Sequence, residues 1–132
     1  MTKARVNGIN VDLSKEREPL VEPLVVFMGM GATRSSWRYQ TETFRRYFRT
    51  VTFDNRGVGK SDKPAGPYSI KMMADETLGL MDHLGIERAH VLGVSLGGMI
   101  AQELAASHPE RVDRVVLGCT FAKAGPTPTF QR

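Results

Sequence analysis

The chain has 132 residues, of which 41% are hydrophobic and 24% are charged, a composition typical of one soluble globular domain. No apolar run approaches the ~20 residues that cross a bilayer, and the first residues lack the apolar block of a secretory signal, so we expect no membrane partner. Cys119 is the only cysteine, which excludes an intrachain disulfide and favours a reducing, cytoplasmic location.

The net charge of +4 includes several arginines between residues 34 and 49. A nucleic-acid surface is one interpretation of such a group. No recognisable nucleic-acid-binding module accompanies the arginines, and the solvated face of a helix is the favoured explanation. We therefore expect no nucleic-acid partner.

The first predicted element is a β-hairpin, because Asn7-Gly8 lies between alternating residues over 3–13. Residues 14–22 are charged, include a proline and are predicted to form a loop. The apolar run Leu24–Met28 predicts a strand buried on both faces, as in a parallel sheet.

The remaining elements alternate between helix and strand after a glycine-rich turn at 29–32. The predicted helices and strands, in chain order, are a helix over 36–47, a strand over 49–53, a helix over 70–84, a strand over 88–92, a helix over 97–107 and a strand over 112–118. Ser69 is the expected N-cap of the second helix, and Gly85 ends it. The tail, residues 122–132, is rich in turn residues and is expected to be loose.

This alternation predicts an α/β protein with a mainly parallel sheet, an N-terminal β-hairpin and helices on both faces of the sheet. We expect residues 1–132 to form a single domain. Active sites on such sheets lie at the carboxyl ends of the strands, which directs attention to the residues that follow each strand.

One motif in that position carries chemistry. The segment Gly93-Val94-Ser95-Leu96-Gly97 matches G-x-S-x-G, and it lies between a predicted strand and a predicted helix. Side chains two residues before and after the serine would collide in so tight a turn, so glycine is needed at both places. Ser95 is therefore the candidate catalytic nucleophile, with the N-terminus of the following helix beneath its hydroxyl.

Four stretches now identify a resemblance, and together they cover about Leu24 to Cys119. They read VVFMGMGATRSSW, VTFDNRGVGKSD, YSIKMMADETLGLMDHLGIERAHVLGVSLGGMIAQELA and HPERVDRVVLGC. In order and spacing they resemble the amino-terminal half of the α/β-hydrolase superfamily, in particular the esterase, enol-lactonase and haloperoxidase-like branch. The resemblance implies a truncated α/β-hydrolase fold without the cap and the C-terminal strands.

The resemblance also implies a hydrolase that acts on activated esters or lactones, as small-molecule substrates, without a cofactor. It implies an oxyanion hole made by the backbone N–H groups of Leu96 and of Met30, which follows Gly29. Many relatives have His-Gly where this chain has Met28-Gly29, but the backbone donor is unaffected by that difference. Residues 54–56 fill the family's D-x-R-G loop, where a loop-fixing ion-pair cluster is favoured over a catalytic role.

The family places an acid and then a histidine after the nucleophile, and this sequence departs from that pattern. Nothing after Asp113 is acidic, and no histidine follows His108. His83, His90 and His108 are all expected at the amino-end rim of the sheet, opposite Ser95. A serine without a base keeps the oxyanion and binding effects, and any base would come from a neighbouring subunit or from water.

Two alternatives therefore stay open. In the first, His83, His90 and His108, with carboxylates near them in sequence, bind zinc or manganese on assembly and hydrolyse esters or phosphotriesters. In the second, the chain is a non-catalytic remnant or half of a split hydrolase.

The last predicted strand, Val112–Gly118, has no following strand to pair with. It would leave an exposed apolar edge, which sheets rarely leave uncovered. We therefore predict a homo-oligomer through this edge.

Overall fold

The computed structural model describes residues 2–13, 22–122 and 129–130. Its elements in chain order are β1 (Thr2–Val6), β2 (Ile9–Leu13), β3 (Pro23–Phe27), η1 (Arg34–Trp37), α1 (Arg38–Phe44), β4 (Arg49–Thr52), β5 (Tyr68–Ser69), α2 (Ile70–His83), β6 (Ala89–Val94), α3 (Leu96–Ser107), η2 (Pro109–Arg111), β7 (Val112–Gly118) and β8 (Thr129–Phe130).

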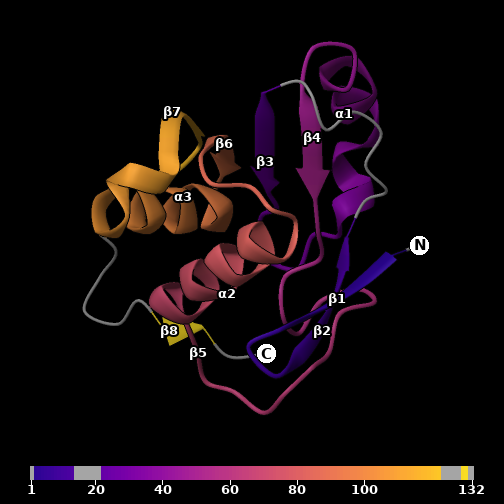
Figure 1. Ribbon diagram of the computed structural model, residues 1–132. Coiled ribbons are helices and arrows are strands. Elements are labelled where there is room, and N and C mark those ends of the chain that lie inside the picture. The colour runs from indigo at the N-terminus through magenta and orange to yellow at the C-terminus, as the bar shows by residue number, and fades with distance from the viewer. Residues whose placement is uncertain (1, 14–21, 123–128, 131–132) are drawn as a thin grey trace.

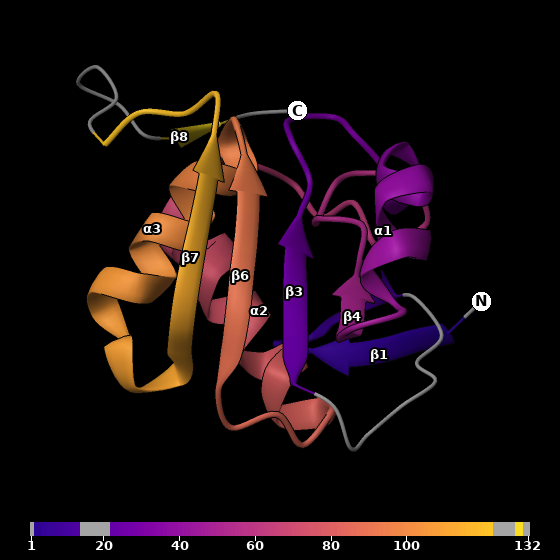
Figure 2. The same cartoon turned by 90° about the horizontal axis from the view of Figure 1, so that it is seen from above.

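A four-stranded parallel sheet with the order β4-β3-β6-β7 forms the centre of the molecule (Figure 1). In Figure 2 the sheet is seen face on, with α2 and α3 behind it and α1 beside β4. The crossover from β3 to β4 places α1 on one face, and the later crossovers place α2 and α3 on the other. The predicted α/β class, with helices on both faces, is confirmed.

The predicted N-terminal hairpin is also confirmed. Strands β1 and β2 pair in antiparallel register from Thr2 with Leu13 to Val6 with Ile9. Asn7 and Gly8 join them with φ angles of 45° and 83°, as a type I′ turn requires at both central positions.

Most of the core lies between the sheet and the α2, α3 and hairpin layer. Alternate residues of β6 point into it, and Val91 and Ala89 are both fully buried. Val25 and Phe27 of β3 belong to the same cluster. The continuous apolar run in β3 is explained because its other residues, Leu24 and Val26, pack under α1 on the opposite face.

The face of the sheet that carries α1 is covered over β3 and β4 but open over β6 and β7. A groove of about 530 Å³ lies there, lined by Glu22, Leu24, Phe44, Phe48, His90, Val91, Leu92, Asp113, Arg114 and Val116. In β7, the edge strand, Val115, Val116 and Leu117 are all exposed. An apolar edge and an apolar half-face are thus left without cover by the described residues.

Two expectations differ from the structure. The predicted helix 36–47 is shorter: it begins as the 3₁₀ turn η1, and α1 ends at Phe44, after which Arg46 and Tyr47 donate their N–H groups in i→i+3 bonds. The tail was expected to be loose, yet Thr129–Phe130 pairs with Tyr68–Ser69. The predicted loop over residues 14–22 lies outside the described residues, apart from Glu22.

The ends of α2 are as predicted. Ser69 Oγ accepts the N–H of Met72 at 3.1 Å, and Gly85 follows the helix with φ 69°. Within the described segments, α2 has 14 residues, and neither it nor any other helix has the length and apolar character of a membrane span.

Candidate active site

The tight turn between β6 and α3 holds Ser95 at the carboxyl edge of the sheet. Ser95 has φ 57° and ψ −121°, a backbone conformation that a residue with a side chain adopts at a cost in energy. Its side chain is exposed. In the part of the chain that the structure describes, no hydrogen bond holds the Ser95 hydroxyl, which leaves it free to meet a ligand.

The glycines on either side of Ser95 are required by the packing. A Cβ at Gly93 would lie 2.3 Å from the carbonyl oxygen of Gly97, across the turn. A Cβ at Gly97 would lie 2.5 Å from the carbonyl oxygen of Phe27 in β3. Both distances are far below van der Waals contact, so the sequence pattern and the geometry agree.

The loop after β3 lies beside Ser95. A Cβ built on Gly29 would lie 3.9 Å from Ser95 Cβ and 3.8 Å from the Val94 carbonyl oxygen. Gly29 is also the first residue of a four-residue turn, in which its carbonyl oxygen accepts the Ala32 N–H at 3.1 Å. Met30 is the second residue of that turn, with its side chain exposed, and Gly31 has φ 71°, as the third position of a type II turn requires.

Helix α3 begins directly under the serine. Leu96 is its first residue, so the Leu96 N–H belongs to the first turn, where no intrahelical acceptor is available. The N–H groups of Gly98 and Met99 both donate to the Ser95 carbonyl, at 3.0 and 3.2 Å. The positive end of the helix therefore faces the region of the Ser95 side chain.

Two residues at the carboxyl end of β7 and just beyond it, which the sequence did not indicate, support the elbow. The Ser95 N–H donates to the Gly118 carbonyl at 3.0 Å, and the Thr120 hydroxyl donates to the Ser95 carbonyl at 2.9 Å. Gly98 permits this approach, because a Cβ there would lie 2.6 Å from the Thr120 side chain. The sequence carries no signal for this support, because it depends on the pairing of β6 with β7.

The loop over residues 54–56 fastens neighbouring segments together. Buried Asp54 accepts the N–H of Arg34 at 2.7 Å and that of Lys60 at 3.0 Å. Arg56 forms an ion pair with Glu76 of α2, and both side chains are nearly buried. Burial raises the pKa of the Glu76 carboxyl, and Arg56 opposes that rise.

The three histidines lie far from Ser95. His83 is the last residue of α2, His108 follows α3, and His90 is the second residue of β6. At a rise of ~3.3 Å per residue, His90 lies roughly 16 Å along the strand from Ser95. None of the three is placed where it could take a proton from the serine hydroxyl.

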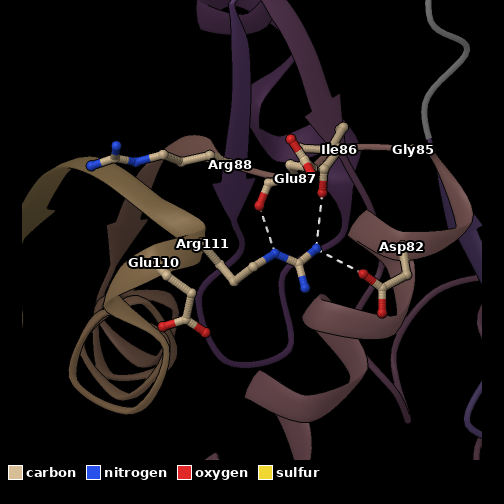
Figure 3. A pocket seen from close by; sticks show the side chains of 7 residues that line it. All are labelled: Asp82, Gly85, Ile86, Glu87, Arg88, Glu110 and Arg111. Carbon is tan, nitrogen blue, oxygen red and sulfur yellow. Dashed lines mark hydrogen bonds and ion pairs between the residues drawn. The ribbon is translucent and has the colours of Figure 1, made fainter.

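A pocket of about 650 Å³ lies at the amino-end rim, where carboxylates were considered as metal ligands (Figure 3). Arg111 occupies it: its guanidinium donates to Asp82 at 2.7 Å and to the carbonyls of Glu87 and Ile86 at 2.6 and 2.9 Å. The side chain of Asp82 is thereby held by a cation, which disfavours a second cation at the same carboxylate.

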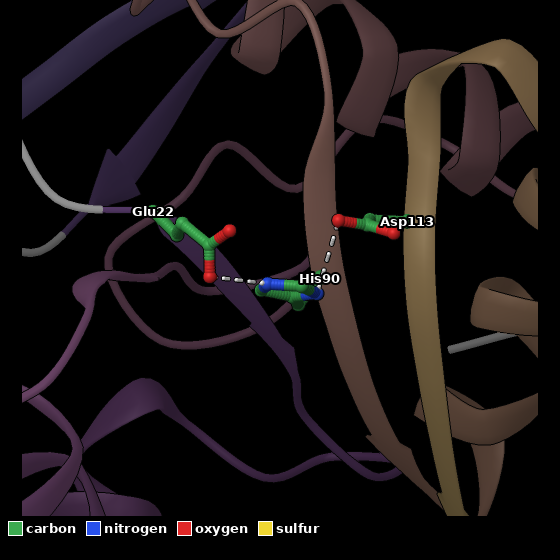
Figure 4. Close-up of side chains that lie close together, drawn as sticks. All are labelled: Glu22, His90 and Asp113. Carbon is green, nitrogen blue, oxygen red and sulfur yellow. Dashed lines mark hydrogen bonds and ion pairs between the residues drawn. The ribbon is translucent and has the colours of Figure 1, made fainter.

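The three histidines are not brought together as one group. Among the described residues, the cluster with ligand atoms close enough for one metal ion is Glu22, His90 and Asp113, all within 4.8 Å of one another. It contains His90 but neither His83 nor His108. Figure 4 shows Glu22 and Asp113 on opposite sides of the His90 ring.

Comparison with known proteins gives a consistent result. Residues 22–132 match the model of a family described as alpha/beta hydrolase fold. The 3-oxoadipate enol-lactonase 2 of Acinetobacter baylyi is 36% identical over 110 residues, which are 83% of this chain and 41% of that protein.

Solved structures show the same likeness. The enol-lactonase from Burkholderia xenovorans LB400 superposes with a TM-score of 0.88 and 37% identity, covering 94% of this chain and 48% of that one. Est816, described as an N-acyl homoserine lactone degrading enzyme, superposes with a TM-score of 0.83 and 32% identity. The superposition covers 90% of this chain and 45% of that one. This chain therefore spans less than half the length of these three relatives.

Proposed function

This chain belongs to the alpha/beta hydrolase fold family, and from that membership we propose that it is a hydrolase of small esters or lactones with Ser95 as its nucleophile. The observation that carries the proposal is the elbow itself. A strained, exposed serine lies at the carboxyl edge of a parallel sheet, between the Gly29–Ala32 turn and the N-terminus of α3.

The proposed chemistry is acyl transfer. Ser95 Oγ attacks the carbonyl carbon of the substrate, the hydroxyl proton leaves to a base, and the carbonyl oxygen becomes an oxyanion. The N–H groups of Leu96 and Met30 are the proposed donors to that oxygen. Removing one such donor typically costs about 3 kcal/mol of transition-state stabilisation, so two of them are a large part of the expected rate effect.

The proposed base is not a histidine of the described fold. His83, His90 and His108 lie at the other end of the sheet, so the proton passes to water or to a side chain of a neighbouring protomer. Without a positioned histidine, oxyanion stabilisation and binding leave a rate about 10³–10⁴-fold above the uncatalysed reaction. We therefore expect slow turnover, which is fastest for substrates with good leaving groups.

Lactones are the proposed substrate class within the esters. The names of all three relatives above refer to lactones: two are enol-lactonases and one is an N-acyl homoserine lactone degrading enzyme. A lactone keeps its leaving group attached to the acyl part after ring opening. That feature suits an open site, because the acyl group and the leaving group remain parts of one small molecule.

We also propose that the chain self-associates through β7. The strand is the edge of the sheet, and Val115, Val116 and Leu117 are exposed along it. Pairing with a second copy would satisfy the free backbone groups of that edge and cover the apolar side chains.

The proposal is tested by turnover of an aryl ester and of an enol-lactone with the full chain. We expect Ser95→Ala to reduce the enzymatic rate to the background rate. Ser107→Ala is the matched control, because Ser107 is a serine at the far end of the same helix and bonds to Glu103. Equal rates for the full chain and Ser95→Ala would refute the nucleophile, and no turnover by either would favour the non-catalytic alternative.

A further inference from the structure

The open face of the sheet carries a cluster that the proposed serine chemistry does not use. His90 of β6 lies between Glu22, just before β3, and Asp113 of β7 (Figure 4). Glu22 Oε2 is 3.0 Å from His90 Nε2, and Asp113 Oδ2 is 3.9 Å from His90 Nδ1. All three residues line the 530 Å³ groove over β6 and β7.

The two ring nitrogens of His90 are in different situations. The Nε2 contact with Glu22 is a normal hydrogen-bond length, whereas 3.9 Å from Nδ1 to Asp113 is too long for a hydrogen bond. Nδ1 is buried and has no hydrogen-bond partner among the described residues. A buried nitrogen without a partner is unfavourable, and it faces a carboxylate that it does not reach.

This arrangement matches a known way of preparing a histidine for a metal ion. A carboxylate that accepts the proton of one ring nitrogen fixes the tautomer and leaves the lone pair of the other nitrogen available. Glu22 is placed to do this at Nε2, and the neutral ring then has its lone pair at Nδ1. Phe48 meets the ring edge to face, with centroids 5.8 Å apart, which holds its orientation.

The separation of Nδ1 and Asp113 suits an ion between them. Zinc binds nitrogen and carboxylate oxygen at about 2.0–2.2 Å, so two tetrahedral ligands lie roughly 3.4 Å apart. The observed 3.9 Å needs a shift of about half an ångström by a side chain that is 43% exposed. Arg88 lies 3.7 Å from the other oxygen of Asp113, Oδ1, which is beyond hydrogen-bond length, so it does not hold this carboxylate as Arg111 holds Asp82.

An irregularity in the strand pairing brings Asp113 to this place. Ala89 pairs with Val112 but Val91 pairs with Val115, so β7 has one extra residue opposite His90. Two consecutive residues, Asp113 and Arg114, consequently both line the groove, although neighbours in a regular strand point to opposite faces. Bulges of this kind redirect side chains and often accompany functional sites.

From these observations we propose that His90 Nδ1 and Asp113 form a binding site for a zinc-type divalent ion, with Glu22 as the positioning carboxylate on Nε2. The site is separate from Ser95, which lies at the other end of β6. Positions on the ion that the protein does not fill are open to water or to a small anion in the groove. Arg114, on the same groove, adds positive charge that favours an anion there.

The first test is a calorimetric titration of the metal-free full chain with Zn²⁺. We expect one saturable site, at least ~10-fold weaker in His90→Gln and in Asp113→Asn. Glu22→Gln should weaken binding by about 10-fold, the usual effect of losing the carboxylate that orients a ligating histidine. Ser95→Ala should bind zinc as the unmodified chain does.

His108→Gln is the matched control, since His108 Nδ1 lies 3.4 Å from Glu110 in a similar histidine and carboxylate pair outside the cluster. Zinc binding unchanged by His90→Gln, or weakened equally by His108→Gln, would overturn the proposal. NMR of the imidazole nitrogens in the unmodified chain gives a second test that needs no variant. Zinc should shift Nδ1 of His90 first, and a first response at Nε2 or at another histidine would also overturn it.

Discussion

The glycines around Ser95 show how closely single residues are constrained at this site. The motif predicted that side chains at positions 93 and 97 would collide, and the atoms that they would meet are backbone atoms that cannot move aside. At Gly29, in the adjoining loop, an added Cβ would meet its neighbours at ordinary van der Waals distances. The packing therefore requires glycine at positions 93 and 97 but leaves room for a side chain at position 29.

A pair of alanine substitutions tests that distinction. Gly97→Ala should lower the free energy of unfolding by about 1–3 kcal/mol, because its Cβ would lie 2.5 Å from the Phe27 carbonyl oxygen. Gly29→Ala should change it much less, because the nearest atom is 3.8 Å away. Thermal or urea unfolding measures both, and an equal loss in the two variants would contradict this account of the elbow.

Other features of the residue scale could not be predicted from the sequence. Thr120 and Gly118 support Ser95 through hydrogen bonds that depend on the positions of two neighbouring strands. The Glu22–His90–Asp113 cluster unites residues from three places in the chain through an irregular strand register, for which the sequence has no signal. The sequence made His90 a candidate metal ligand, but it did not indicate that Glu22 and Asp113 lie on either side of its ring.

At the scale of elements, long periodic or continuously apolar segments were the predictable ones. Strands β3, β6 and β7 and helices α2 and α3 were all expected within a few residues of their bounds. Strands β5 and β8 were missed because two-residue strands have no periodicity to detect. The start of α1 was missed because a 3₁₀ turn and an α-helix share similar local patterns.

The ion pair between Arg56 and Glu76 joins the loop after β4 to α2, and it predicts a pH effect. Because burial raises the pKa of Glu76 in the folded state, the folded chain retains this proton at pH values where the unfolded chain has released it. The contribution of Glu76 to the free energy of unfolding therefore falls as pH rises from the pKa of Glu76 in the unfolded chain through its raised pKa in the folded chain. Arg56→Leu removes the cation that opposes the rise and should widen that window.

We expect Arg56→Leu to cost about 3 kcal/mol at pH 8, where a carboxylate must be buried unpaired, and clearly less at pH 5, where it can take a proton. Urea unfolding at both pH values measures the difference. Lys71→Gln is the control, because its partner Asp75 is exposed and the pair should add no comparable pH dependence. A loss in Arg56→Leu that is equal at both pH values would disprove the explanation.

The edge strand β7 carries the prediction of self-association. Val116→Lys places a charge on a residue that is 60% exposed, and charges on edge strands oppose pairing with another chain. We expect at least a ~10-fold weaker self-association by analytical ultracentrifugation. Tyr47→Lys, at an exposed aromatic residue after α1, should leave it unchanged. Identical mass distributions for the chain and Val116→Lys would argue against association through β7.

At the scale of the whole molecule, the central fact is partial coverage of the relatives. The chain covers nearly all of its own length in each superposition but only 48% of the Burkholderia enol-lactonase and 45% of Est816. What it holds is the nucleophile elbow, the loop beside it and the sheet that supports them. What it exposes is the half-face over β6 and β7.

The fold was predictable at this scale because alternation and one motif specify the topology together. The base for the proposed serine chemistry was not, since the described residues place none near Ser95, and the open groove with its candidate metal ligands lies along the amino-terminal part of β6. The proposed serine chemistry and the proposed metal binding therefore lie at two separate places. Each can be tested without disturbing the other.

The most direct measurement is the site of covalent labelling by a fluorophosphonate probe, mapped by mass spectrometry on the full chain. The account predicts one adduct, on Ser95, which is absent in Ser95→Ala and retained in Ser107→Ala. An adduct on a different residue, or undiminished labelling of Ser95→Ala, would contradict it.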